Sequence, residues 1–193
     1  MALSNAQTKT TTASPPAQTS PLVLRIIGAV ALAHLINDLI QAVLPSIYPM
    51  LKAKYDLTFT QIGLITLTFQ MTASLLQPWV GYYTDRHPNP LLLPAGMVCT
   101  LVGILMLSQV GSFPLILLAA ALVGIGSSTF HPEASKVARL ASGGRYGFAQ
   151  STFQVGGNAG SAFGPLLAAA IIIPFGQGNV AWFGLFALFA VGL

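Results

Sequence analysis

The chain has 193 residues, of which 54% are hydrophobic and 6% are charged. Ordinary soluble domains carry roughly 25% charged residues, so eight Lys and Arg with four Asp and Glu cannot cover a soluble surface. The mean hydropathy of +0.74 indicates a chain that lies in a lipid bilayer. The net charge of +4 comes without a basic run, so no nucleic-acid partner is expected.

The chain divides into a polar start and a long apolar remainder. Residues 1–20 are rich in Thr, Ser, Ala and Pro and lack the hydrophobicity to fold alone, which predicts a disordered cytoplasmic tail. They do not resemble a secretory signal, because no short apolar core with a small-residue cleavage site follows a basic start. We expect residues 21–193 to form one transmembrane bundle.

Six apolar segments are long enough, or nearly so, to cross a bilayer, which takes about 20 residues. The expected helices cover residues 22–50, 60–83, 91–110, 114–135, 146–173 and 180–193. Pro45 and Pro49 should bend the far end of the first helix. The last segment holds fourteen residues, too few to cross, so we expect a truncated helix and a longer parent protein.

The basic residues predict the orientation of the bundle. With the N-terminus inside, the inside segments hold six Lys and Arg and the outside segments hold two, which favours a cytoplasmic N-terminus. The inside residues are Lys9, Arg25, Arg86, Lys136, Arg139 and Arg145, and the outside ones are Lys52 and Lys54. We expect a multi-pass protein of the bacterial inner (cytoplasmic) membrane.

A short internal repeat accompanies this pattern. Thr68-Phe69-Gln70 in the second expected helix recurs as Thr152-Phe153-Gln154 in the fifth. Each lies in the second helix of a three-helix unit, and the two helices cross in opposite directions. Inverted three-helix repeats are common in transporters, so the motif adds a little support for such a fold.

The first expected helix carries a polar stripe. Its residues recur at spacings of four, three, four and three, and they are His34, Asp38, Gln41, Pro45 and Tyr48, with Asn37 beside them. Asp38 lies near the middle of the span, where a carboxylate costs about 2.5–3.5 kcal/mol. Such a group persists where it faces protein or water, and it can take up and release a proton. The alternative is a static hydrogen bond between Asp38 and His34.

The fifth expected helix has two opposite faces. One repeats amide side chains every four residues and the other repeats glycines, and the members are Gln150, Gln154 and Asn158 against Gly156, Gly160 and Gly164. The glycine face predicts close helix packing. The amide face predicts either a cavity lining that contacts substrate or hydrogen bonds between helices. Gln70 in the second helix invites the same interpretation.

The fourth expected helix ends in a polar group. Pro132 should kink or end the helix, which places His131 and Glu133 near its cytoplasmic end. Ion pairing with Lys136, Arg139 or Arg145 is the simplest role for Glu133. His34, Asp38, His131 and Glu133 are metal-ligand types, but their spacing lacks a His-x-x-x-His or Glu-x-x-His pair, so we expect no metal and no cofactor.

The loop after the second helix carries a family signature. Gly81-Tyr-Tyr-Thr-Asp85-Arg86 resembles the Gly-x-x-x-Asp-Arg/Lys motif of the major facilitator superfamily, at the expected loop. The following His87-Pro88-Asn89-Pro90 departs from that motif. Gly160-Ser-Ala-Phe-Gly164-Pro165 resembles part of the antiporter motif of the same family, with Pro165 at the packing face.

Six further segments carry a more specific pattern: His34-Leu-Ile-Asn-Asp38, Leu57-Thr-Phe-Thr-Gln-Ile-Gly63, Leu75-Leu-Gln-Pro78, Phe130-His-Pro-Glu133, Ala141-Ser-Gly-Gly144 and Phe153-Gln-Val-Gly-Gly-Asn158. With these segments the chain resembles fosmidomycin-resistance transporters of bacteria. The resemblance implies an all-α fold, the N-terminal six-helix bundle of a superfamily transporter, built as 3+3 inverted repeats. It also implies a missing C-terminal six-helix half and a cavity lined by helices one, two, four and five.

The implied activity is proton-driven efflux of small drugs such as the phosphonate antibiotic fosmidomycin. Asp38 would then carry the proton, with His34 and Asn37 tuning it, and Gln41, Gln70 and the amide face of the fifth helix would contact the drug. Gly81, Asp85 and Arg86 would act at the cytoplasmic gate. The alternatives are an importer of an organic anion or sugar on the same fold, a membrane-embedded enzyme, and a non-transporting scaffold.

Overall fold

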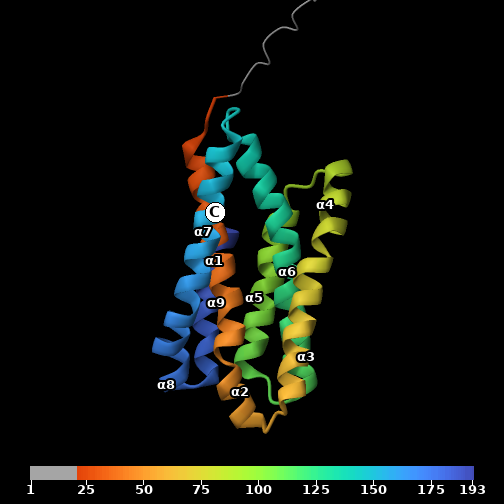
Figure 1. Cartoon of the computed structure of the whole chain (residues 1–193), viewed down its shortest axis with the longest axis vertical. Coiled ribbons are helices and arrows are strands. Elements are labelled where there is room, and N and C mark those ends of the chain that lie inside the picture. The colour runs from red at the N-terminus through yellow and green to blue at the C-terminus, as the bar shows by residue number, and fades with distance from the viewer. Residues whose placement is uncertain (1–20) are drawn as a thin grey trace, which may run out of the picture.

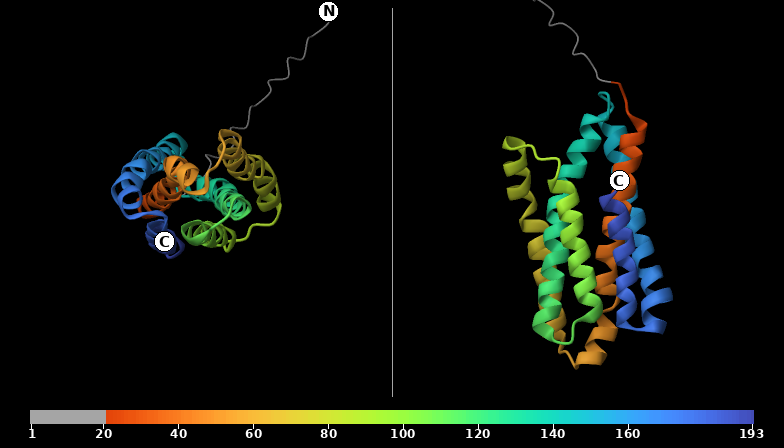
Figure 2. Two further views of the ribbon diagram at one scale, coloured as in Figure 1. Left: turned by 90° about the horizontal axis from the view of Figure 1, so that it is seen from below. Right: turned by 180° about the vertical axis from the view of Figure 1, so that it is seen from behind.

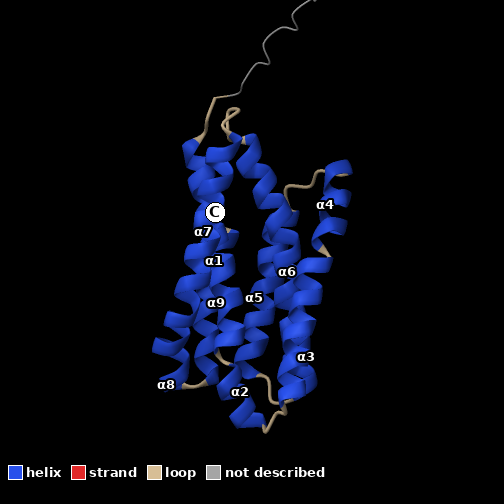
Figure 3. Ribbon diagram, in the orientation of Figure 1, coloured by secondary structure: helices blue, strands red, loops and turns tan. Residues whose placement is uncertain are grey.

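The computed structural model describes residues 21–193, and all the regular structure among them is helical (Figures 1 and 3). The all-α prediction is therefore confirmed for this part of the chain. The tail predicted over residues 1–20 lies outside the described residues. Five helical segments are long and apolar enough to span a membrane: Leu24–Ser46, Phe59–Arg86, Leu92–Gln109, Phe113–Leu140 and Tyr146–Phe175. A sixth, Gln177–Val191, is shorter.

The first expected helix is divided in two. Helix α1 spans Leu24–Ser46 and helix α2 spans Tyr48–Tyr55, with the break at Ile47 between the two prolines. Pro49 falls in the first turn of α2, where a missing backbone N–H costs nothing. The bend predicted from Pro45 and Pro49 is thus present, but as a break between helices.

The second segment begins at a well-defined cap and is widened in the middle. Helix α3 (Phe59–Gln70) starts with a capping box, in which Thr58 and Gln61 satisfy each other's backbone N–H groups. A π-helical turn, η1 (Met71–Leu75), precedes α4 (Gln77–Arg86). Pro78, in the first turn of α4, removes a backbone donor and accounts for the irregularity before it.

The remaining helices alternate in direction along the bundle (Figure 1). Helix α5 (Leu92–Gln109) leads to α6 (Phe113–Leu140), and α7 (Tyr146–Leu167) continues through the π-helical η2 (Ala168–Ile172) into α8 (Ile173–Phe175). The 3-10 helix η3 (Gln177–Trp182) and α9 (Phe183–Val191) complete the described chain.

Helix α6 is longer than predicted. The sequence placed its end at residue 135, with Pro132 as a kink or a stop, yet the helix runs on to Leu140. Pro132 removes one intrahelical bond, but Phe130 and Ala134 on either side of it are fully buried. Packing on both sides holds the helix across the proline, so His131 lies well inside α6.

Two helix pairs make the most extensive contacts, α1 with α7 and α5 with α6. Helix α9 packs on α5 and α1, and α3 packs on α6, which also touches α1. Seen from below and from behind, this arrangement places α1, α7 and α9 on one side of the bundle and α3 and α4 on the other (Figure 2).

The glycines of α7 explain its contact with α1. A Cβ added at Gly156 or Gly160 would collide with backbone carbonyl oxygens of α1, at Ala31 and Leu35 respectively. A Cβ at Gly164 would lie 2.6 Å from Leu39 O. The glycine spacing thus lets two backbones approach closely, as the sequence predicts. Pro165, which was also predicted to pack, is exposed.

We predict that Gly160→Ala destabilises the bundle by about 1–3 kcal/mol, because the added methyl meets backbone that cannot move aside as a side chain can. The matched control is Gly147→Ala on the same helix, where nothing lies within 4 Å of an added Cβ. Thermal unfolding of both purified variants in detergent measures the difference. Equal midpoints for the two variants would contradict the proposed packing.

Candidate functional site

Asp38 is the centre of a polar cluster inside the bundle. Its Oδ1 lies 3.2 Å from each of three side-chain nitrogens, those of Asn37, Gln41 and His131. Its Oδ2 lies 3.3 Å from Nε2 of His34, one turn earlier on α1. Four nitrogens therefore surround one carboxyl group, which offsets the cost of removing it from water.

His34 fixes the cluster to helix α7. The ring is buried, its Nδ1 lies 2.8 Å from the carbonyl oxygen of Phe153, and it stacks on the Phe153 ring at a centroid distance of 4.0 Å. Gly157 follows one turn later, and a Cβ there would meet both the His34 ring and Oδ2 of Asp38. A larger residue at position 157 would push α7 away from the cluster.

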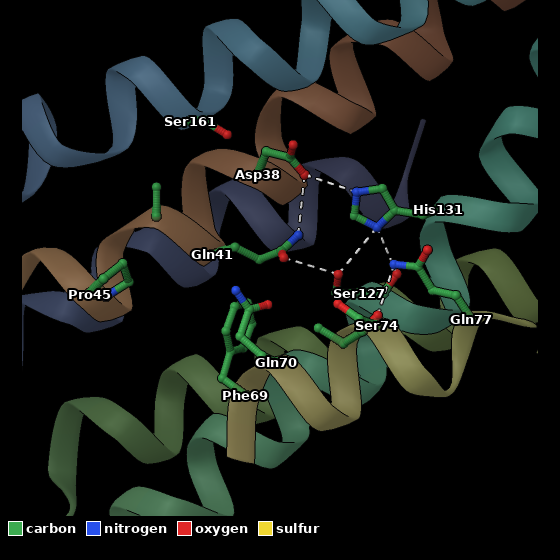
Figure 4. A pocket seen from close by; sticks show the side chains of 12 residues that line it. Asp38, Gln41, Pro45, Phe69, Gln70, Ser74, Gln77, Ser127, His131 and Ser161 are labelled. Carbon is green, nitrogen blue, oxygen red and sulfur yellow. Dashed lines mark hydrogen bonds and ion pairs between the residues drawn. The ribbon is translucent and has the colours of Figure 1, made fainter. Parts of the chain in front are cut away.

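His131 reaches the same carboxyl group from helix α6 (Figure 4). Its Nδ1 lies 2.9 Å from the carbonyl oxygen of Ser127 and 3.2 Å from the hydroxyl of the same residue. The Ser127 hydroxyl also lies 3.0 Å from Oε1 of Gln41, to which it donates a hydrogen bond. Asp38, Gln41, Ser127 and His131 thus form a closed hydrogen-bonded ring between α1 and α6. The sequence placed His131 near the cytoplasmic end, whereas the structure places it beside Asp38.

A cavity of about 310 Å³ opens beside this ring. Four helical segments line it, from α1, the α3–α4 segment, α6 and α7 (Figure 4). The lining residues are Asp38, Gln41, Ala42, Pro45, Phe69, Gln70, Ala73, Ser74, Gln77, Ser127, His131 and Ser161. Asp38 and His131 are the titratable members of this lining.

Two of the five residues predicted to contact substrate line this cavity, Gln41 and Gln70. The other three lie outside it, on the exposed face of α7, and are Gln150, Gln154 and Asn158. Oε1 of Gln150 accepts a hydrogen bond of 3.2 Å from the hydroxyl of Ser135 on α6.

Sequence reasoning gave no cavity role to four polar residues of the lining. Ser127 precedes His131 by four residues and lies on the same face of α6. Ser74 and Gln77 follow Gln70 at spacings of four and three, so they continue its helical face. Ser161 follows Asn158 by three residues and continues the amide face of α7. Following each helix face in steps of three or four residues from a polar residue already named identifies all four.

A second polar cluster ties the end of α4 to α6. Nζ of Lys136 lies 2.8 Å from Asp85 and 2.9 Å from Glu133, and it also donates to the hydroxyl of Thr84. The ion pair expected for Glu133 is thus made with Lys136. Gly81 lies at the same contact, since a Cβ added there would be 3.8 Å from Pro132.

Arg86 takes no part in this network within the described residues. Its guanidinium lies 3.6 Å from the centroid of the Tyr82 ring and donates to the Tyr82 carbonyl oxygen. The two charged residues of the Gly81–Arg86 segment therefore have different surroundings.

The types and spacing of one group of residues would also suit a metal ion. Donor atoms of His34, Asp38 and His131 lie within 4.8 Å of one another. However, each histidine Nε2 faces a different carboxyl oxygen at 3.2–3.3 Å, and two amide groups donate to the same carboxyl. This is the geometry of a hydrogen-bonded carboxylate whose oxygens are already taken by donors.

The sequence of this bundle matches a known family. Residues 30–193 match the family model of the Major Facilitator Superfamily. The chain belongs to the Major Facilitator Superfamily. Membership of this superfamily of transporters agrees with the prediction that the chain is not an enzyme, and with the prediction of a membrane-spanning, six-helix N-terminal fold.

Two known proteins are similar to most of the chain. The fosmidomycin resistance protein of Escherichia coli (strain K12) is 63% identical over 166 residues, which cover 86% of this chain and 41% of that protein. An uncharacterized MFS-type transporter, YfnC, of Bacillus subtilis (strain 168) is 45% identical over 183 residues, covering 95% of this chain and 44% of that protein. The chain thus spans less than half the length of these relatives.

We predict that the two acids paired with Lys136, Asp85 and Glu133, contribute unequally to the stability of the bundle. Asp85→Asn should lower the free energy of unfolding by less than about 1 kcal/mol, because the Asp85 side chain is 66% exposed. Glu133→Gln should cost more, about 1–3 kcal/mol, because its side chain is 14% exposed and Lys136 loses its better-shielded partner. Unfolding of the two purified variants in detergent compares them, and a larger loss for Asp85→Asn would contradict this ranking.

Proposed function

We propose that the chain is the N-terminal half of a proton-coupled efflux transporter for small drugs such as fosmidomycin. The observation that carries the proposal is a carboxyl group, Asp38, held between two histidines at the wall of a polar cavity. The name of the relative from Escherichia coli supports the choice of drug.

Proton coupling needs a group that can change its charge inside the membrane. Asp38 is surrounded by donors and lies beside a cavity of about 310 Å³, so it is shielded from lipid but open to that cavity. In an antiporter, proton binding and drug binding must exclude each other. The protein then changes from inward-facing to outward-facing with one of the two bound and returns with the other. A titratable cluster on the cavity wall supplies that exclusion.

The proposed orientation has the N-terminus in the cytoplasm. The start of α1 and the ends of α4 and α6 share one end of the bundle, while α2 lies at the other (Figure 1). The end with the start of α1 carries most of the Lys and Arg residues, and the end with α2 carries Lys52 and Lys54. This distribution favours the end with the start of α1 as the cytoplasmic one. The Lys136–Asp85–Glu133 cluster then lies at the cytoplasmic gate.

A second six-helix half would complete the site. Gln150, Gln154 and Asn158 lie on an exposed face of α7, and much of α3 is exposed as well. Polar amides facing lipid would be left without hydrogen-bond partners, so a facing bundle suits this surface better than lipid does. We place the assembled protein in the bacterial inner membrane.

The complete transporter in inside-out vesicles tests the proposal. Addition of fosmidomycin under an imposed pH gradient should release protons from the vesicle lumen, followed with a pH-sensitive dye. Asp38→Asn should abolish this release, because the amide removes the negative charge that holds the protons of the two histidines. Asp56→Asn is the matched control, since Asp56 lies in a left-handed turn after α2, where Asn is well tolerated.

Three outcomes are informative. Release by the wild type and by Asp56→Asn, but not by Asp38→Asn, would support proton-coupled efflux through the cluster around Asp38. Release that persists in Asp38→Asn would show that coupling does not need the Asp38 carboxylate and would overturn this cluster as the proton site. The absence of release from a well-expressed wild type would overturn fosmidomycin–proton exchange, and uptake measured in the opposite direction would then test the importer alternative.

A further inference from the structure

We propose that His131 carries the exchangeable proton of the cluster, and that Ser127 conveys its protonation state to Gln41 in the cavity. The inference rests on the proposed function, which it deepens by naming the proton-bearing atom and the substrate contact that depends on it. The sequence pattern predicted Asp38 as the proton carrier, with His34 and Asn37 tuning it.

The hydrogen-bond partners define the protons on both rings. Nδ1 of His34 faces the Phe153 carbonyl oxygen and Nδ1 of His131 faces the Ser127 carbonyl oxygen, and a carbonyl only accepts. Each Nε2 faces an oxygen of Asp38, and an ionised carboxylate only accepts as well. The described arrangement therefore fits one carboxylate between two doubly protonated rings.

The two rings differ in what can replace a lost proton. His34 is buried, and its two nitrogens face acceptors, the Phe153 carbonyl oxygen and the Asp38 carboxylate. Either nitrogen would lose its hydrogen bond without its proton. His131 lines the cavity, and the Ser127 hydroxyl lies 3.2 Å from its Nδ1. Deprotonated Nδ1 of His131 would lose its hydrogen bond to the Ser127 carbonyl oxygen, but the hydroxyl of the same residue can donate to it in exchange.

Charge repulsion between the two protonated rings favours the loss of a proton from one of them. The two ring centroids are 5.0 Å apart, so two imidazolium groups repel each other across Asp38. The α3–α4 segment and α7 contribute Gln70, Gln77 and Ser161 to the cavity lining, all uncharged. Glu133, on the same helix as His131, is paired with Lys136.

Proton loss from His131 would rearrange the cavity wall. The Ser127 hydroxyl has a single hydrogen, which it now donates to Oε1 of Gln41. When that hydrogen turns to Nδ1 of His131, Gln41 Oε1 is left free in the cavity to accept from an O–H or N–H of a substrate. The amide oxygen has two lone pairs, so the Ser127 hydrogen bond occupies one of them and weakens the oxygen as an acceptor. A proton on His131 and a donor-bearing substrate on Gln41 would therefore oppose each other, as antiport requires.

Nitrogen-15 NMR of the histidine-labelled protein in lipid nanodiscs tests the first step. The chain holds three histidines, His34, His87 and His131, so the signals can be assigned with single Gln variants. On raising the pH, His131 should lose one proton and become the Nε2–H tautomer while His34 stays doubly protonated. Three results would overturn the inference. They are deprotonation of His34 before His131, a neutral His131 that keeps its proton at Nδ1, and a bound metal in place of both Nε2 protons.

The second step is tested with Ser127→Ala against Ser128→Ala. Ser128 is the matched control because its hydroxyl donates to its own helix at Ile125 and does not line the cavity. Ser127→Ala should remove the Nε2–H preference of neutral His131, and Ser128→Ala should keep it. An unchanged tautomer in Ser127→Ala would overturn the role of Ser127.

A transport measurement separates this inference from the proposed function. In vesicles with the complete transporter, His131→Gln should lose drug-evoked proton release, and His87→Gln, in the exposed loop after α4, should keep it. Release that persists in His131→Gln while the wild type is active would overturn the inference alone. A wild type without release would overturn the proposed function, and the NMR result would still decide the protonation of His131.

Discussion

A single carboxyl group in an apolar bundle sets the main constraint on this structure. Asp38 lies near the middle of α1, where an isolated carboxylate would cost about 2.5–3.5 kcal/mol. Two histidines and two amides offset this cost, and they come from two different helices. The packing of α1 against α6 and α7 is therefore tied to the protonation state of the groups around Asp38, which is the property that a coupled transporter needs.

Close backbone packing makes this arrangement possible. The glycines of α7 allow its backbone to approach α1, and the Phe153 carbonyl then reaches the buried ring of His34. Gly157 leaves room for that ring and for the Asp38 carboxyl. One face of α7 thus holds the cluster in place, while its opposite, amide-bearing face remains exposed. The small residues are part of the site although they carry no chemistry of their own.

The sequence predicted the polar stripe of α1 well, because a repeat of three and four residues places His34, Asp38 and Gln41 on one helix face. It misplaced His131, since a proline in a helix usually ends or bends it, and burial on both sides of Pro132 cannot be seen in a pattern. It predicted the amides of α7 either at a cavity or in hydrogen bonds between helices, and they lie on an exposed face where Gln150 bonds to Ser135 of α6. Periodicity identifies a face of a helix, but the neighbour of that face depends on how the helices pack.

The contact between Asp38 and His131 joins α1 to α6, lies in the cavity wall and includes the proposed proton site. Its interaction energy is therefore the quantity to measure. A double-mutant cycle of Asp38→Asn and His131→Gln, with unfolding followed in detergent, isolates this interaction. The structure predicts non-additive losses, with a coupling energy of about 1 kcal/mol or more, because the two side chains are 3.2 Å apart. Losses that add within about 0.3–0.5 kcal/mol would contradict a direct interaction between the two residues and with it the proposed proton site.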